Sequence, residues 1–535
     1  MESVKHALRC GKVAAVGAVL AAGLLFSPAD AAAAEAQESK AKKPNIIVIM
    51  TDDVGYGDLG CYGGGVMRGA PTPNLDRMAK EGMRFADYYG QASSTAGRAS
   101  FVTGRIPIRT SLSSVLAPGD PNGIKKETPT IAQALKGLGY KTVQLGKWHL
   151  GDKEENFPTA VGFDEMYHMT PYYAGVYAYE NAELHPNFPR NDPKFMKEWR
   201  ELAVLSEFEG KAGEKPKVVT EDFNYQNLKT GDDNMRAKAV EWIKQNAKGD
   251  QPFFMYLNFL KVHNPNNPVD RWKGKAPGGM PYQDALMEMD DNSGQIIQAV
   301  RDLKIDKDTL IIWTTDNGAW LDAWPDAGYT PFRGMKGTPF EGGFRVPAIA
   351  WWPGHIPAGS VATDMMSHMD WWPTLVKVAG GTPPPYKWKD NNGKPIIFDG
   401  IDNSEMLLGK GPGKRDFFAY FNDQKFGAIR YTNLKMVFTA KDTWLGPELE
   451  INPPAIYDLW QDPGENYDLI FNGAAPTRGE FKTSPGRYAG QDNGWMAIKM
   501  NPPLISFLEE FKEFPNTPYK PWGMGLTKVI PAEFK

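Results

Sequence analysis

The stretch NIIVIMTDD, at residues 45–53, decides the fold class of this chain. Its aliphatic residues follow one another without a polar interruption, which is the pattern of a strand buried on both faces of a parallel sheet. Similar runs recur at residues 142–145, 253–259, 309–315 and 348–351. Segments with helical spacing of apolar residues alternate with these runs, at residues 131–138, 233–246 and 282–303. The alternation predicts an α/β fold in which helices flank a large, mostly parallel sheet.

The pattern changes after about residue 400. Short strand candidates then follow one another, at residues 417–421, 426–430, 434–439 and 455–459, and a late helix is expected near residues 504–514. This order predicts a small antiparallel α+β subdomain over residues 401–535. Residues 44–400 would form the main domain, and its residues 170–232, rich in Tyr, Pro, Asn and Lys, are expected to be a long insertion.

The N-terminus has the features of an export signal. Three basic residues lie within the first 12, an apolar run covers residues 13–26, and small residues follow it. We expect residues 1–31 to be a signal peptide and residues 32–43 a linker, because the apolar run is short for a membrane span. An uncleaved N-terminal anchor is the alternative. The expected location is the bacterial periplasm or the medium, without a membrane partner.

Charge and cysteine content exclude several classes of protein. The chain has 535 residues with 60 Lys+Arg against 64 Asp+Glu, a net charge of −4. A protein that binds nucleic acid by charge would carry a basic excess, so no nucleic-acid partner is expected. Two cysteines, Cys10 and Cys61, are too few for a disulfide framework or a multi-thiolate metal site.

Acidic and amide side chains follow two of the expected strands. Asp52 and Asp53 come directly after the first strand, and Asp316 and Asn317 follow the strand at residues 309–315. An isolated acidic pair would more often cap the next turn. Two such clusters at one edge of a parallel sheet instead predict an all-oxygen site, which suits Ca²⁺ or Mg²⁺ better than zinc.

Basic side chains follow two further strands. Lys147 and His149 come after the strand at residues 142–145, and His263 comes after the strand at residues 253–259. Ser94 and Arg98 are four residues apart, so they share a face at a helix N-terminus, where the helix dipole favours an anion. Each histidine alone is as compatible with a structural role as with a catalytic one, and the segment with Ser94 and Arg98 alone would more often be a turn of small residues that leads into a helix.

Together and in this order, the motifs resemble the sulfatase family of the alkaline-phosphatase superfamily. The matching segments are residues 45–60 (NIIVIMTDDVGYGDLG), 71–82 (PTPNLDRMAKEG), 94–98 (STAGR), 146–151 (GKWHLG), 316–318 (DNG), 334–347 (GMKGTPFEGGFRVP) and 457–469 (YDLWQDPGENYDL). The resemblance implies an alkaline-phosphatase-like core. It also implies hydrolysis of sulfate esters, either aryl sulfates or sulfated carbohydrates.

The resemblance also implies a role for each site residue. Asp52, Asp53, Asp316, Asn317 and the oxygen at Ser94 would hold a divalent cation, usually Ca²⁺ in this family, with Mg²⁺ as the alternative. Ser94 would be the position that is converted to formylglycine, whose hydrate supplies the nucleophile. The residues expected to surround it, to bind the sulfate and to exchange protons are Arg98, Lys147, His149, His263 and Lys336.

Ser94 departs from the commoner Cys of the family, and three interpretations compete. A maturase of the radical S-adenosylmethionine type, which the family uses on serine, would convert Ser94 to formylglycine. Ser94 would otherwise be an introduced replacement of Cys in an arylsulfatase. Or it stays serine and acts as in alkaline phosphatases, on phosphomonoesters or phosphodiesters. An inactive binder of sulfated ligands is a further alternative.

Aromatic residues crowd two regions near the expected site. Trp320, Trp324 and Tyr329 lie between the DNG motif and Lys336, and four tyrosines lie in the expected insertion, at residues 172, 173, 177 and 179. Rings near an anion site stack on an aryl group or on a sugar face. Packing of the insertion onto the core is the equally weighted alternative.

Overall fold

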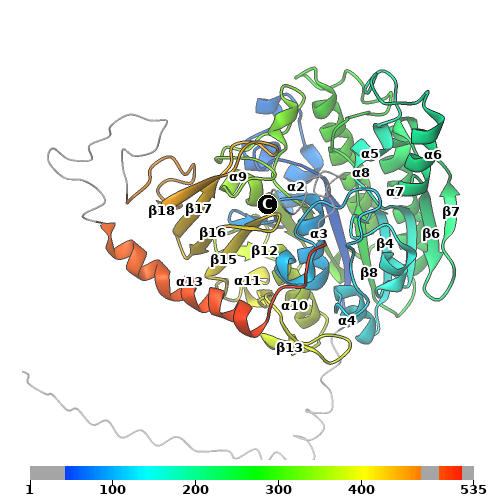
Figure 1. The fold of residues 1–535 in the computed structure, drawn as a ribbon. Coiled ribbons are helices and arrows are strands. Elements are labelled where there is room, and N and C mark those ends of the chain that lie inside the picture. The colour runs from blue at the N-terminus through cyan, green and yellow to red at the C-terminus, as the bar shows by residue number, and fades with distance from the viewer. Residues whose placement is uncertain (1–41, 471–492, 521–535) are drawn as a thin grey trace, which may run out of the picture. The chain divides into compact units, whose positions relative to one another are not determined.

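The computed structural model describes residues 42–470 and 493–520 (Figure 1). The expected signal peptide and nearly all of the expected linker therefore lie outside the described residues. Among the described residues, no helix combines the length and the hydropathy that crossing a membrane requires.

A ten-stranded sheet forms the centre of the main domain, in the order β11-β2-β10-β9-β1-β8-β4-β5-β6-β7. Its five central strands run parallel: β9 (Thr309–Thr315), β1 (Asn45–Thr51), β8 (Phe253–Asn258), β4 (Lys141–Lys147) and β5 (Glu165–Thr170). The register places Val48 beside Tyr256 of β8 and Ile312 of β9. The mostly parallel sheet predicted from the buried runs is confirmed.

Shorter strands extend the sheet at both edges. On one side lie β10 (Ala348–Trp351), β2 (Met83–Phe85) and β11 (Ser360–Ala362), and on the other β6 (Glu207–Lys211) and β7 (Lys217–Thr220). Both β6 and β7 belong to residues 170–232, so part of this segment joins the sheet. The same segment also contains α5 (Ala174–Ala178) and α6 (Pro193–Leu202).

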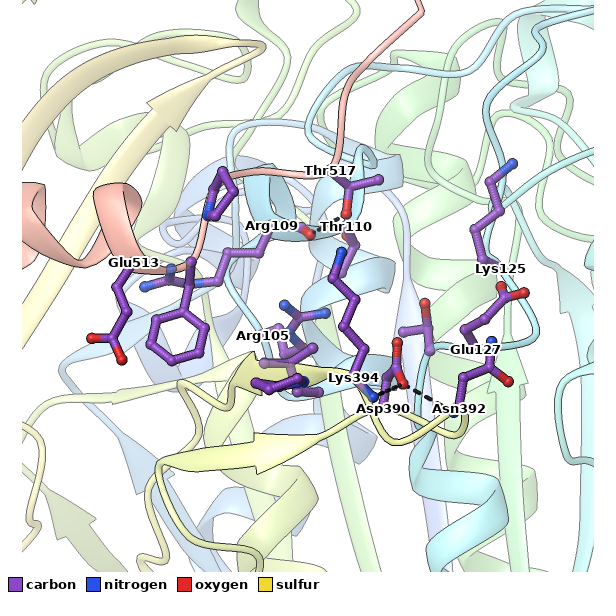
Figure 2. Close-up of a pocket in the computed structure, with 15 residues that line it drawn as sticks. Arg105, Arg109, Thr110, Lys125, Glu127, Asp390, Asn392, Lys394, Glu513 and Thr517 are labelled. Atoms are coloured by element: carbon purple, nitrogen blue, oxygen red, sulfur yellow. Dashed lines mark hydrogen bonds between the residues drawn. The ribbon is translucent and has the colours of Figure 1, made fainter.

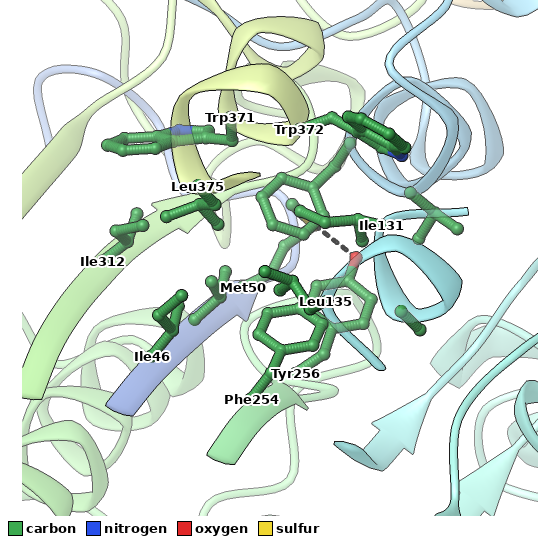
Figure 3. Close-up of a cluster of buried hydrophobic side chains, with 14 of the residues drawn as sticks. Ile46, Met50, Ile131, Leu135, Phe254, Tyr256, Ile312, Trp371, Trp372 and Leu375 are labelled. Carbon is green, nitrogen blue, oxygen red and sulfur yellow. Dashed lines mark hydrogen bonds between the residues drawn. The ribbon is translucent and has the colours of Figure 1, made fainter. Parts of the chain in front are cut away.

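Helices cover both faces of the sheet, and alternate residues of β1 point to opposite faces. Ile46, Val48 and Met50 pack with α3 (Ser94–Thr103), α4 (Ile131–Gly137) and α10 (His368–Val378). Figure 3 shows part of this cluster, including Ile131 and Leu135 of α4 and Trp371, Trp372 and Leu375 of α10. Ile47 and Ile49 pack on the other face with α2 (Pro73–Glu81), α7 (Tyr225–Asn246) and α8 (Pro281–Asp302). Burial on both faces explains why β1 has no alternation of polar residues.

The C-terminal region forms a four-stranded antiparallel sheet, β15 (Phe417–Asn422), β16 (Lys425–Tyr431), β17 (Leu434–Ala440) and β18 (Leu449–Asp458). Helix α13 (Trp495–Glu513) packs on it through Met500 and Phe507. The remaining elements are β3 (Tyr88–Tyr89) paired with β12 (Met366–Ser367), β13 (Lys387–Lys389) paired with β14 (Pro395–Ile397), and the short helices α9 (Glu341–Phe344) and α11 (Ser404–Leu407).

Two helices begin earlier than the sequence patterns indicated. Helix α13 begins at Trp495 and contains Pro502 and Pro503, whereas the sequence pattern placed its start near residue 504. Helix α7 begins at Tyr225 because Asn224 caps it, with Asn227 returning a hydrogen bond to the Asn224 backbone.

Candidate active site

The expected site residues meet at one edge of the sheet. Strands β1, β4, β8 and β9 end there. Helix α3 begins there, and its first residue, Ser94, is buried. Ligands of open α/β sheets bind beyond the carboxyl ends of the strands, so this is the edge at which chemistry is expected.

The acidic side chains form a compact, buried group. The backbone N–H of Asp53 donates to Asp316 Oδ1 over 3.4 Å, and Asn317 Nδ2 donates to Asp53 Oδ1 over 2.7 Å. Asp52, Asp53 and His263 each offer a ligand atom, and these atoms lie within 4.8 Å of one another. Asp53 Oδ2 is buried without a hydrogen-bond partner among the described residues. An orphaned carboxylate oxygen in an oxygen-rich group fits a bound divalent cation.

Three cationic side chains balance the three carboxylates. Arg98 donates from Nε and Nη2 to Asp316 Oδ2 over 3.1 and 2.8 Å. Lys147 Nζ contacts Asp52 Oδ2. These charges are all buried, so each requires its partner to offset the loss of hydration.

Lys336 pairs with the second carboxylate of the acidic group. Its Nζ donates to Asp53 Oδ1 over 2.6 Å, and the side chain is 1% exposed. Burial raises the pKa of both Asp52 and Asp53, but Lys147 and Lys336 outweigh it, and both carboxyl pKa values fall below the usual range. The carboxylates are therefore ionised and ready to hold a metal ion.

Ser94 sits against the acidic group at the start of α3. Its Oγ lies 3.0 Å from Asp52 Oδ1 and 3.2 Å from Asn317 Oδ1, so its hydroxyl can donate to either. Gly97 allows the helix to come this close, because a Cβ there would lie 2.1 Å from the carbonyl oxygen of Asp316. The small residue in the STAGR motif is thus required by packing in this chain.

The two histidines are held by backbone carbonyls. His149 Nε2 lies 3.0 Å from the oxygen of Leu116, and its Nδ1 has no hydrogen-bond partner among the described residues. Burial, with Lys147 adding to it, lowers the pKa of His149 well below 6.5, so the ring is neutral. With Nε2–H donating to Leu116, Nδ1 carries a free lone pair and can act as a base.

His263 lies on the other side of the acidic group. Its Nδ1 is 2.6 Å from the oxygen of Asn264, and its Nε2 is 3.7 Å from Asp53 Oδ2. Burial and Lys336 lower the pKa of His263, while the Asp53 carboxylate acts in the opposite direction.

The structure brings all ten expected site residues together. Nine are joined by the contacts described above, and His149 adjoins them through the ring of Tyr173, which lies 5.6 Å from His149 and 5.3 Å from His263. The catalytic role of each residue stays a prediction.

Sequence reasoning missed several residues of this site. Asn258 accepts from Arg98 Nη1 over 2.8 Å, and its signal was a polar residue at the end of the buried run FFMYLN. Trp444 places its ring centre 4.7 Å from Lys336 Nζ, and nothing in its local sequence indicated this. Cys61, which sequence reasoning set aside, has a pKa raised by burial to about 12, so its thiol is not a ready nucleophile.

The aromatic residues divide into three groups. Trp320 and Tyr173 contact site residues. Tyr172 and Tyr177 are buried and pack within the second face of the core. Trp324 is 67% exposed, with no ring contact to the site among the described residues. Both roles considered for these rings, packing and a place at the site, therefore occur.

A cavity of about 540 Å³ lies elsewhere, beyond the C-terminal end of α3 (Figure 2). Its lining includes Arg105, Arg109, Glu127 and Lys394, and none of the ten site residues. The site residues themselves are at most 5% exposed, so the catalytic centre is closed in this structure.

Comparison with known proteins identifies the family. The family model for sulfatases matches residues 44–381. The chain belongs to the sulfatase family. Sulfatases are sulfuric ester hydrolases, and the protein is an enzyme of this class.

Individual relatives are similar over most of their length. N-acetylgalactosamine-6-sulfatase of Sus scrofa is 33% identical over 463 residues, which are 80% of this chain and 82% of the relative. Arylsulfatase A of Homo sapiens is 33% identical over 459 residues, 82% of this chain and 85% of the relative. Among solved structures, the sulfatase PsFucS1 of Pseudoalteromonas sp. is 31% identical with a TM-score of 0.79, covering 91% of this chain and 94% of its own.

Proposed function

We propose that this sulfatase removes sulfate from a saccharide, using formylglycine made from Ser94. The observation that supports the proposal is the position of Ser94 Oγ, which lies between Asp52 and Asn317 of the acidic group at the N-terminus of α3. The name of N-acetylgalactosamine-6-sulfatase supports a saccharide substrate, and arylsulfatase A suggests that aryl sulfates serve as assay substrates.

The acidic group is proposed to hold Ca²⁺, with Mg²⁺ as the alternative. The ligands would be oxygens of Asp52, Asp53, Asp316 and Asn317 together with the oxygen at position 94. A bound divalent cation supplies positive charge that polarises the sulfate and favours an ionised nucleophile.

The side chains of the site divide the remaining work. Lys147 and Arg98 place positive charge on the β4 and α3 side of the site, where it would stabilise charge on the sulfate oxygens. Lys336 and His263 lie on the side of Asp53, and in the proposal they supply the proton that the leaving oxygen takes up.

The proposed nucleophile is one hydroxyl of hydrated formylglycine. Its oxygen, once its proton has been released to solvent, forms a bond to sulfur while the bond from sulfur to the sugar oxygen breaks and that oxygen takes a proton. The second hydroxyl then gives its proton to His149, the aldehyde re-forms, and the bond from carbon to the sulfate oxygen breaks. An unmodified serine lacks the second hydroxyl and cannot release sulfate in this way.

The proposal includes a maturation partner and an exported location. Serine requires oxidation to become formylglycine, and a maturase of the radical S-adenosylmethionine type is the proposed partner. Export to the periplasm is proposed from the N-terminal basic and apolar pattern.

The decisive experiment is the mass of the tryptic peptide 85–98 from protein made in its natural host. Loss of two hydrogens at Ser94 supports the formylglycine route. An unmodified serine contradicts it and leaves the phosphatase-like or inactive alternatives, which turnover of an aryl sulfate, an aryl phosphate and a phosphodiester then separates. Hydrolysis of the phosphate alone would overturn the assignment of substrate.

A further inference from the structure

The catalytic centre is separated from solvent by aromatic rings. Lys147, His149, His263 and Lys336 are between 0 and 5% exposed. Three rings that touch this group, those of Tyr173, Trp320 and Trp444, are only half-buried. Since one side of each ring meets the catalytic side chains and another side meets solvent, these rings form the rim of the site.

The three rings form a continuous arc. The Tyr173 ring lies 5.3 Å from His263, and the His263 ring lies 5.4 Å from Trp320. The Trp320 and Trp444 rings are 5.8 Å apart at 57°. Lys336 Nζ lies 5.4 Å from the centre of Trp320 and 4.7 Å from that of Trp444. The two tryptophans therefore flank the catalytic lysine on the side of the proposed leaving group.

Trp444 comes from the C-terminal sheet, in the segment between β17 and β18. Its backbone N–H donates to Asp322 Oδ2 over 3.1 Å, which ties the segment to the main domain. Its side chain lies on the backbone of Gly337, where an added Cβ would be 3.0 Å from Trp444 Cγ. Gly337 has a φ of +77°, so the lack of a side chain serves both the turn and the ring.

The arc contains an unused hydrogen-bond donor. Trp320 Nε1 is buried and has no partner among the described residues. Buried indole N–H groups normally find an acceptor. A sugar hydroxyl is such an acceptor, and a pyranose also offers an apolar face to a tryptophan ring. A plain aryl group offers the face without the acceptor.

We propose that Tyr173, Trp320 and Trp444 form the subsite for the sugar ring that carries the sulfate. This inference rests on the proposed function, because it assigns the alcohol part of the same ester. The sulfate itself is bound by the charged side chains, and the sugar ring stacks on the arc. The segment between β17 and β18 thereby contributes a sugar-binding residue to a site that the main domain otherwise supplies.

The test compares Trp444→Ala with Trp444→Phe and with a matched control, Trp324→Ala. Trp324 is 67% exposed, so the control removes the same side chain outside the arc. The substrates are galactose 6-sulfate and 4-nitrophenyl sulfate, and inorganic sulfate is used as an inhibitor. We expect Trp444→Ala to raise KM for galactose 6-sulfate at least tenfold, with little change in kcat. We expect the inhibition constant for inorganic sulfate to stay constant, because sulfate does not need the rings.

Each of the remaining outcomes either supports or overturns the proposal. Trp444→Phe is expected to recover most of the affinity for galactose 6-sulfate that Trp444→Ala loses. Trp324→Ala is expected to behave as the wild-type enzyme. An unchanged KM for the sugar in Trp444→Ala overturns the proposal. A rise in KM for 4-nitrophenyl sulfate alone overturns the assignment to the sugar ring, and so does weaker inhibition by inorganic sulfate, because it shows that the variant has damaged the catalytic centre.

Failure of the proposed function is distinguishable from failure of this inference. If the wild-type enzyme hydrolyses neither galactose 6-sulfate nor 4-nitrophenyl sulfate, the proposed function fails. Calorimetric binding of galactose 6-sulfate to the same three variants then still tests the subsite. Weaker binding in Trp444→Ala alone supports it, and equal binding in all three overturns it.

Discussion

Replacing Lys435 by Met tests how the C-terminal sheet is attached to the catalytic domain. Lys435 lies on β17 and is fully buried, with Nζ 3.1 Å from Glu341 Oε1 and 2.8 Å from Glu465 Oε1. Glu341 begins α9, five residues after Lys336, and Glu465 Oε2 accepts the backbone N–H of Glu341 over 2.7 Å. One lysine therefore bridges two buried acidic side chains from different parts of the chain.

Met keeps the length of the side chain but removes its charge, so Glu465 would lose its cationic partner and Glu341 would keep only the more distant Arg345 and Arg430. Removing one partner of a buried ion pair costs about 3–5 kcal/mol, and we expect a loss in this range in the free energy of unfolding. Urea unfolding at pH 8, followed by tryptophan fluorescence, measures it. Burial raises the pKa of Glu465. Protonation of Glu465 at pH 5.5 therefore removes part of the repulsion between Glu465 and Glu341. The loss in the free energy of unfolding caused by Lys435→Met should be smaller at that pH.

Two comparisons decide whether this reasoning holds. Lys387 pairs with Glu513 at the surface, where both side chains are more than half exposed, and Lys387→Met should cost no more than about 1 kcal/mol. The triple variant with Lys435→Met, Glu341→Gln and Glu465→Gln should regain most of the stability, since the two acidic side chains that Lys435 contacts no longer carry a charge. A loss in Lys435→Met no larger than in Lys387→Met, or a triple variant as unstable as the single one, would refute the argument.

Four further predictions concern the site and its surroundings. Asp316→Ala should abolish turnover and metal binding together, measured by an aryl sulfate assay and elemental analysis; full turnover with stoichiometric metal would contradict the assignment of this ligand. Lys336→Ala should lower kcat by about 10²-fold or more, as for loss of one charge-stabilising donor, with a far smaller change in Tm; unchanged kcat would remove Lys336 from the site. Gly97→Ala should destabilise the fold by about 1–3 kcal/mol because its Cβ would meet the Asp316 carbonyl, whereas Gly137→Ala, which meets no atom within 4 Å, should be neutral or stabilising in urea unfolding. Burial raises the pKa of Asp58 to about 6, so the native state retains a proton that the unfolded state releases above pH ~4. The free energy of unfolding should therefore fall as pH rises from 4 to 6, and Asp58→Asn should reduce this slope; equal slopes would contradict the shift.

The centre of the fold could be predicted from the sequence because its signals are local and strong. Strands β1, β8, β9 and β10 are buried on both faces and read as largely apolar runs, and β4 is buried in the same way although Gln144 lies within it. Very short strands and exposed strands carry no such signal. The three-residue β2 and the largely exposed β7 exist because a neighbouring strand pairs with them, which is a property of the tertiary structure.

The candidate site was predictable for the same reason. Asp52, His149 and Asp316 follow buried strands, and the strand-end rule brings them to one edge of the sheet. Trp444 could not be found in this way, because it lies more than 100 residues beyond Lys336 in the sequence and follows an antiparallel strand. It reaches the site through packing on Gly337. Catalytic roles, in contrast, came from the resemblance to sulfatases and not from position.

The position of β1 between β8 and β9 determines how early the central sheet can form in a newly synthesised chain. Asn45, at the start of β1, contacts residues 208 and 264 positions later, so the middle of the sheet cannot form until residues up to about 315 have been synthesised. Contacts this distant in sequence make folding slow. In the finished fold Ser94 is only 1% exposed. The maturase proposed above for Ser94 would therefore act during this interval, on a chain whose sheet has not yet closed, and the strand order would give it the time to do so.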